Sequence, residues 1–268
     1  MLFRSGFSIP EKELKAQVEF TLATFRGKLD KISKGDAVPG RNTTASYALF
    51  TLEIAGHAPD KTTAALVDFL VARQNADGSW PATSNRPPTE GSRFVTAALA
   101  LEALRHYGPT KDDKTRREKT DVAFDKGKAW LLKNEPADTE DRVFRLRALA
   151  TLKEEKFLAA ARDELLKAQH KDGSWSQIAK RDGDAYATAT VLMALRQAGV
   201  AADHSAYRNG VAYLLKTQTA EGAWLVPTRS KPVQRFFDNG DPGGKDQFIS
   251  FAATGWAVQA LLECVPVR

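Results

Sequence analysis

The apolar segment 185–195 is preceded by two aspartates, Asp182 and Asp184, which are separated by one glycine. Two carboxyls this close in sequence could act as an acid pair. A carboxylic acid that keeps its proton can act as a general acid. Asp184 is the preferred proton donor, because it opens an apolar helix in which desolvation would raise the pKa of its carboxyl. Asp182 is the second catalytic candidate.

The other apolar segments of the chain also begin with polar residues. These are Arg41, Asn42 and Thr43; Glu90, Ser92 and Arg93; Asp141 and Arg142; Tyr186; and Lys245, Asp246 and Gln247. Helix N-termini present unpaired N–H groups and favour anions. The alternative is that Asp, Ser and Thr simply cap the helices that follow them. Taken together they predict a concave site with converging polar groups. Four of them are predicted to contact a ligand: Arg93, Arg142, Tyr186 and Asp246.

A seven-residue motif recurs three times and indicates how these segments are held. The copies are Gln74-Asn-Ala-Asp-Gly-Ser-Trp80, Gln169-His-Lys-Asp-Gly-Ser-Trp175 and Gln218-Thr-Ala-Glu-Gly-Ala-Trp224. The second and third copies lie 49 positions apart, and the first lies 95 positions before the second. A fixed period of this size predicts an array of similar supersecondary units.

Each residue type in the motif has a structural explanation. The glutamine can bond the loop backbone, and the glycine allows a tight turn with φ > 0. The tryptophan is predicted to pack between neighbouring repeats, with its indole N–H bonded. Gln74, Trp80, Gln169, Trp175, Gln218 and Trp224 are therefore predicted to be structural residues.

Two kinds of helix alternate along the chain, and no segment shows the strict alternation of a strand. Helices that are apolar on most sides are expected to be inner helices, whereas amphipathic ones are expected outside. The outer helices are predicted near 11–27, 60–74, 120–134, 156–169 and 204–218. The inner helices are predicted near 43–56, 91–107, 141–153, 184–198 and 246–263. The sequence thus predicts an all-α array of five helical hairpins.

The Gln-x-x-Asp-Gly-Ser-Trp motif resembles the QW repeat of squalene–hopene cyclases and is similar to the repeats of protein prenyltransferase β subunits. The resemblance implies a single α/α-toroid domain over residues 1–268, with inner helices around a central cavity. It also implies an isoprenoid or another apolar small molecule as ligand. Aromatic side chains that could line such a cavity include Tyr47, Tyr186, Phe248 and Trp256.

The catalytic motifs of these families do not carry over to this sequence, and no Asp-x-Asp-Asp occurs in it. Cyclases of this kind protonate an alkene with the middle Asp of an Asp-x-Asp-Asp motif. The nearest patterns identified are Asp182-Gly-Asp184, which lacks the last Asp, and Asp238-Asn-Gly-Asp241, which has another spacing. The prenyltransferase zinc site needs an Asp, a Cys and a His, and Cys264 lies in the wrong segment. No cofactor is therefore predicted.

The longest break between apolar segments runs from Pro227 to Gly244 and contains several acidic residues. Asp238 and Asp241 could offer oxygen ligands to calcium, but their spacing is not that of an EF-hand. The alternative is a run of Asx and glycine turns. No metal site is predicted, and these two aspartates are the only weak candidates.

The composition and charge of the chain limit the kinds of partner that we expect for the protein. The 268 residues carry a formal charge of +6, and the basic residues are dispersed without a basic–aromatic face, so no nucleic acid partner is predicted. A single cysteine excludes an intrachain disulfide. The apolar run 247–262 is too short and too polar to predict a membrane span, while peripheral membrane contact stays open. The sequence predicts no particular oligomeric state or localisation, and both a cytoplasmic form and a periplasmic or secreted native form stay open.

Three functions remain open from the sequence. The first is a terpenoid-cyclase-like protein that binds an isoprenoid in its cavity. The second is a lyase or hydrolase of acidic polysaccharide, a substrate class used on other α/α toroids. The third is a non-catalytic interaction module of a larger protein, since repeat scaffolds often present a binding face without chemistry.

Overall fold

The computed structural model describes residues 10–82, 86–109, 113–232 and 235–265. Within these ranges the chain is helical, and its only β-type pairing is an isolated bridge between Trp175 and Asp184. The prediction of an all-α chain built from alternating helices is confirmed. The described chain falls into two compact units, one spanning Ile9–Asn85 and Thr89–Glu135 and the other including Arg86–Pro88 and Pro136–Arg268. We call them the N-terminal and C-terminal units. That they form a single domain stays a prediction.

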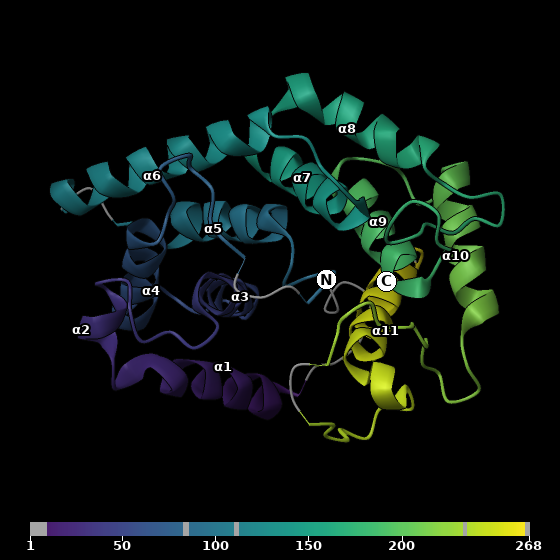
Figure 1. The fold of residues 1–268 in the computed structure, drawn as a ribbon, viewed down its shortest axis with the longest axis horizontal. Coiled ribbons are helices and arrows are strands. Elements are labelled where there is room, and N and C mark those ends of the chain that lie inside the picture. The colour runs from purple at the N-terminus through teal and green to yellow at the C-terminus, as the bar shows by residue number, and fades with distance from the viewer. Residues whose placement is uncertain (1–9, 83–85, 110–112, 233–234, 266–268) are drawn as a thin grey trace. The chain divides into compact units, whose positions relative to one another are not determined.

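The N-terminal unit is built around two adjacent apolar helices, α3 and α5 (Figure 1). Its α-helices are α1 (Glu11–Arg26), α2 (Leu29–Ile32), α3 (Arg41–Ile54), α4 (Lys61–Ala72), α5 (Arg93–Tyr107) and α6 (Lys114–Lys133). Helix α5 has no polar stripe and is buried along most of its length, which makes it an inner helix. Helix α4 packs on both α3 and α5, and α6 packs on α4 and α5.

The C-terminal unit repeats the same plan around three inner helices. Its helices are α7 (Thr139–Leu152), α8 (Glu155–Lys167), α9 (Ala185–Gln197), α10 (Ser205–Thr217), a 3₁₀ turn η2 (Gly244–Asp246) and α11 (Gln247–Leu262). Helix α9 packs against α7 and α11, while α8 and α10 cover α7 and α9 from outside (Figure 1). Every residue of α9 from Ala185 to Leu195 is buried, as expected for the central helix of a layer.

The observed helices differ from the predicted segments mainly at α6. This helix begins at Lys114, six residues before the predicted start, because the Asp113 carboxylate accepts a bond from the Arg116 N–H and caps it. Its first turns are charged and exposed, so apolar periodicity could not reveal them. The short helix α2 was also not predicted.

The repeated motif forms a joint between successive helices. The indole N–H groups of the three motif tryptophans donate to the carbonyls of Leu70, Leu165 and Leu214 at 2.8, 2.7 and 2.7 Å. The Gln169 amide donates to the Gly173 carbonyl in its own loop and to the Ala206 carbonyl at the start of α10. In this copy the motif therefore ties the end of α8 to the start of α10.

Two glycines lie against the rings of Trp80 and Trp175, where close packing leaves little room for a side chain. A Cβ on Gly127 of α6 would lie 2.5 Å from the Trp80 ring, and a Cβ on Gly210 of α10 would lie 2.9 Å from Leu192 and 3.1 Å from the Trp175 ring. The Trp80 and Trp175 indoles thus pack closely against α6 and α10 at these two glycines. No helix in the described part of the chain is long and apolar enough to cross a membrane.

Candidate functional site

The loop between Trp175 and α9 carries both predicted catalytic aspartates and is held rigidly. The Asp184 N–H donates to the Trp175 carbonyl at 3.1 Å, and the Tyr213 hydroxyl donates to the Gly183 carbonyl at 2.9 Å. A Cβ on Gly183 would lie only 1.7 Å from Ser174 Oγ. Packing against Ser174 therefore requires glycine between the aspartates, and Asp182 is left exposed to solvent.

Asp184 is the N-cap residue of α9. Its Oδ1 accepts a bond from the Ala187 N–H at 2.9 Å, and its Oδ2 accepts one from the Gln177 amide at 3.0 Å. Burial raises the pKa of Asp184, while the bonds from Ala187 and Gln177 oppose that rise. Both carboxylate oxygens are thus acceptors, which is the arrangement of a cap. The role of proton donor stays a prediction for Asp184, and this geometry does not favour it.

A different acid, Glu140, lies buried beside this cap. It is the second residue of α7, only 3% of its surface is exposed, and its Oε1 accepts a bond from the Tyr186 hydroxyl at 3.0 Å. Tyr186, a predicted ligand residue, is itself 1% exposed. The two side chains join the first turns of two adjacent inner helices, α7 and α9.

The environment of Glu140 favours its protonated form. Burial raises the pKa of Glu140 to about 8, and the negative charges of Asp138 and Asp141 act in the same direction. The Tyr186 hydroxyl and the positive charge of Arg147 oppose the rise. A carboxyl with this pKa is largely neutral at pH 7 and holds a proton inside the C-terminal unit.

Sequence analysis missed Glu140, although a signal was present. Asp138-Thr139-Glu140-Asp141 has the spacing of the cyclase Asp-x-Asp-Asp motif with glutamate at the middle position. This segment is closer to the cyclase motif than the patterns at 182–184 and 238–241, and it lies at the start of the inner helix α7. The glutamate at position 140 is the one departure of this segment from the Asp-x-Asp-Asp pattern.

A guanidinium lies farther along the same helix. Glu140, Phe144 and Arg147 follow each other at helical spacings of four and three residues, so they share one face of α7. The Arg147 guanidinium carbon lies 5.0 Å from the centre of the Phe144 ring and 5.2 Å from the Trp256 ring of α11. Trp256, a predicted ligand residue, therefore contacts a fixed cation in this unit.

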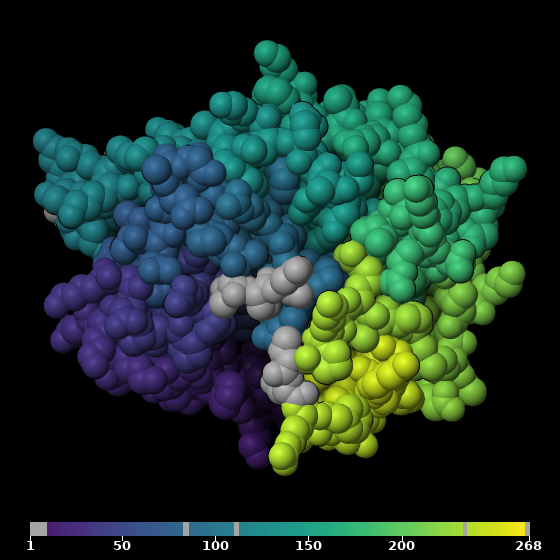
Figure 2. All heavy atoms as spheres, viewed as in Figure 1, coloured from purple at the N-terminus to yellow at the C-terminus, as the bar shows by residue number. Residues whose placement is uncertain are grey.

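The other ligand candidates of the C-terminal unit are not gathered around Glu140. The Arg142 guanidinium pairs with Glu164 of α8, and the Asp246 carboxylate accepts a bond from the Thr228 N–H at 2.9 Å. Phe248 in the first turn of α11 is 60% exposed. The described part of the loop before α11 and that helix are coloured yellow-green to yellow in Figure 2. Phe236 and Phe237 of this loop are also exposed.

Two predicted ligand residues belong to the N-terminal unit. Arg93, the first residue of α5, is exposed, and its charge helps to lower the pKa of Asp77 after the bonds from Ser79. Tyr47 of α3 is half-buried and lines a groove of about 400 Å³ between α3 and α1, together with Phe20 and Glu90. The contribution of these residues to ligand binding stays a prediction.

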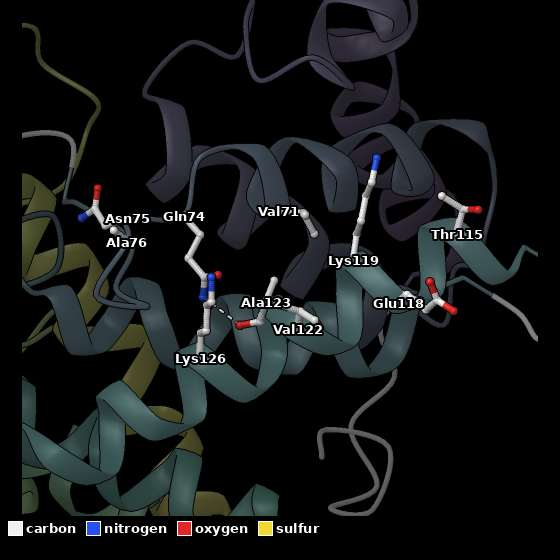
Figure 3. Close-up of a pocket in the computed structure, with 10 residues that line it drawn as sticks. All are labelled: Val71, Gln74, Asn75, Ala76, Thr115, Glu118, Lys119, Val122, Ala123 and Lys126. Carbon is white, nitrogen blue, oxygen red and sulfur yellow. Dashed lines mark hydrogen bonds between the residues drawn. The ribbon is translucent and has the colours of Figure 1, made fainter.

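A second groove of the N-terminal unit lies between the end of α4 and α6 (Figure 3). Its volume is about 420 Å³, with Val71 and Val122 on its sides and the aliphatic part of Lys119 nearby. The Gln74 amide reaches across it to the Ala123 carbonyl at 2.8 Å. This groove therefore lies where the first copy of the repeated motif joins α4 to α6.

The acidic segment before α11 forms turns. The carboxylates of Asp238 and Asp241 accept bonds from the N–H groups of Gly240 and Gly243 at 2.9 and 2.8 Å, and the Asn239 amide oxygen accepts one from the Asp241 N–H. These are the Asx turns of the alternative interpretation. Among the described residues, no group of three or more His, Cys, Asp or Glu side chains could hold a metal ion.

Comparison with known families agrees with this architecture. The model of the squalene-hopene cyclase C-terminal domain matches residues 105–268, more than half of the chain and all of α7 to α11. The chain belongs to this family. It is a terpenoid-cyclase-like protein, and its helical hairpins are those of the α/α-toroid class. A search of curated proteins finds no match.

Proposed function

We propose that this terpenoid-cyclase-like protein binds an isoprenoid and protonates it with Glu140. The observation that carries the proposal is a buried carboxyl that accepts a bond from the Tyr186 hydroxyl and lies at the middle position of an acidic Asp-x-Glu-Asp motif. Its burial raises the pKa of Glu140 to about 8, which favours the protonated form at pH 7. Membership of the squalene-hopene cyclase family supports an isoprenoid as the ligand.

The chemistry is general-acid catalysis. Glu140 gives its proton to one carbon of a carbon–carbon double bond, whose π electrons form the new C–H bond, and the other carbon becomes a carbocation. The cation is consumed when a neighbouring carbon loses a proton or when water adds. Glu140 is left as a carboxylate and regains its proton from solvent.

Protonation of an alkene is uphill, so the carboxylate that forms must be stabilised. The Tyr186 hydroxyl already donates to Glu140 Oε1, and the first turn of α7 presents backbone N–H groups and the positive end of the helix dipole. The Arg147 charge also favours the ionised form of Glu140. The same site therefore stores the proton and stabilises the anion that its release creates.

Binding is tested by native mass spectrometry of the purified protein, alone and with squalene or a prenyl diphosphate added. We expect a retained or acquired isoprenoid, and a product that differs from the added compound by a new ring, a shifted double bond or an added water. Glu140→Gln should bind but give no product. The matched control Glu155→Gln, which changes an exposed carboxyl at the start of α8, should behave as the wild type.

Two results would contradict the proposal. If neither compound binds, the protein is not an isoprenoid-binding protein, and the interaction module or the polysaccharide enzyme becomes the better account. If Glu140→Gln forms product at the wild-type rate, the acid lies elsewhere, with Asp184 as the next residue to test.

A further inference from the structure

Arg229 is a cation held close to the acids from a different part of the chain. It lies in the long segment between Trp224 and α11, and only 14% of its side chain is exposed. Its Nε donates to the Gln177 side-chain oxygen at 2.7 Å, and its Nη2 lies 3.5 Å from Asp138 Oδ2. A guanidinium buried to this extent requires a negative partner, and Asp138 supplies it.

Asp138 and Glu140 are two acids in one helical turn with different surroundings. Asp138 caps α7 by accepting the Asp141 N–H at 3.1 Å, its side chain is 25% exposed, and Arg229 faces it. Glu140 is 3% exposed, and its oxygen accepts a bond from the uncharged Tyr186 hydroxyl. Two neighbouring carboxyls shielded from solvent do not both ionise readily, so the one beside a cation ionises first.

We propose that Arg229 is a positioning residue that holds Asp138 as a carboxylate and thereby leaves the single proton of this acid pair on Glu140. Its value for catalysis rests on the function proposed above, whereas the location of the proton is independent of turnover. The segment before α11 thus determines which acid of the motif is charged.

The other charged and titratable groups around the pair do not replace Arg229. From α7 itself, Asp141 adds negative charge and Arg147 adds positive charge near Glu140. From α9, Tyr186 faces Glu140, while Asp184 is linked to Arg229 through Gln177. Burial raises the pKa of Asp138, and Arg229 is the positive charge that opposes this rise.

The test is a carboxyl titration of the full chain labelled with ¹³C at the side-chain carboxyls of Asp and Glu, followed by NMR. Signals are assigned with Asp138→Asn and Glu140→Gln. In Arg229→Gln we expect Asp138 to titrate at a pH higher than in the wild type by about one unit or more, the effect of a neighbouring guanidinium. The matched control Arg235→Gln removes an exposed arginine of the same segment and should leave both signals unchanged.

A charge-preserving variant separates the charge of Arg229 from its packing. Arg229→Lys should return the Asp138 titration most of the way to wild type, although lysine cannot reproduce the planar contact with Gln177. An Arg229→Gln protein with an unchanged Asp138 titration would overturn the proposal, and so would an Arg229→Lys protein that titrates like Arg229→Gln.

A second measurement applies even when Arg229→Gln does not fold. Asp138→Asn removes a negative charge beside Glu140, so Glu140 should then titrate at a lower pH than in the wild type. An unchanged Glu140 signal would show that the two acids are not coupled and would overturn the proposal. Failure to bind or convert an isoprenoid would leave these titrations unaffected, so the two proposals fail separately.

Discussion

Replacing Glu140 with glutamine should change how the stability of the protein depends on pH. In the unfolded chain this carboxyl ionises near its ordinary pKa of 4.5, whereas in the folded protein burial raises the pKa to about 8. Between these values the folded state holds a proton that the unfolded state has lost. The contribution of Glu140 is therefore fully present below pH 4.5, declines as the pH rises, and levels off above about pH 8.

The magnitude follows from linkage. Each pH unit between the two pKa values lowers the free energy of unfolding by about 1.4 kcal/mol, so the full loss approaches about 5 kcal/mol. The glutamine side chain has nearly the same shape, could still accept the Tyr186 bond, and carries no charge at any pH. We therefore expect Glu140→Gln to be about as stable as wild type below pH 4.5 and more stable near pH 8.

The assay is urea denaturation followed by far-UV circular dichroism across about pH 4 to pH 9, with the two proteins compared at each pH. Taking the difference cancels the titration of the remaining groups. The control Asp182→Asn changes an exposed carboxyl and should follow the wild-type curve. A stability difference between Glu140→Gln and wild type that does not change with pH would refute the claim that Glu140 is neutral in the folded protein.

Two further predictions concern the repeat joints. Gly127→Ala places a methyl group 2.5 Å from the Trp80 ring, and overpacking of about 1–3 kcal/mol should outweigh the gain of about 1 kcal/mol in helix propensity. Gly255→Ala in α11 meets nothing within 4 Å, so it should raise the thermal midpoint while Gly127→Ala lowers it. Thr188→Val removes the hydroxyl that accepts a bond of 3.0 Å from the backbone N–H of Trp175. It should lower the free energy of unfolding, measured by chemical denaturation, by about 1–3 kcal/mol. Thr190→Val should cost less, because that hydroxyl only donates to carbonyls of its own helix; equal losses would contradict this account.

The sequence predicts the helices well because burial follows their apolar patterns. The predicted segment 184–198 corresponds to α9 at Ala185–Gln197, and 204–218 corresponds to α10 at Ser205–Thr217. The resemblance of the Gln-to-Trp motif to the QW repeat implies the family that the comparison shows. The early start of α6 was not predictable in this way, because its first turns depend on a cap and on exposed charges.

The candidate site was predicted only in outline. The proposed acid Glu140 lies at the start of an inner helix, where the sequence predicts the site, but the sequence does not show which carboxyl is buried with an uncharged partner. Asp184 and Glu140 both lie at the start of an inner helix, and their hydrogen-bond partners distinguish them. Asp184 accepts bonds from the Gln177 amide and the Ala187 backbone N–H, whereas Glu140 accepts one from the Tyr186 hydroxyl. Arg229 is far from Asp138 in the sequence, so no local pattern could pair them.

The most direct test of the central claim is product analysis in D₂O. The carboxyl proton of Glu140 exchanges with solvent, so acid-initiated conversion must place one deuterium on carbon. Squalene and a prenyl diphosphate are incubated in D₂O with wild type, Glu140→Gln and the control Glu155→Gln, and the extracts are examined by mass spectrometry. Our account predicts a deuterium-containing product from wild type and Glu155→Gln and none from Glu140→Gln. Deuterated product formed at an equal rate by Glu140→Gln would contradict it, and so would conversion by wild type without deuterium in the product.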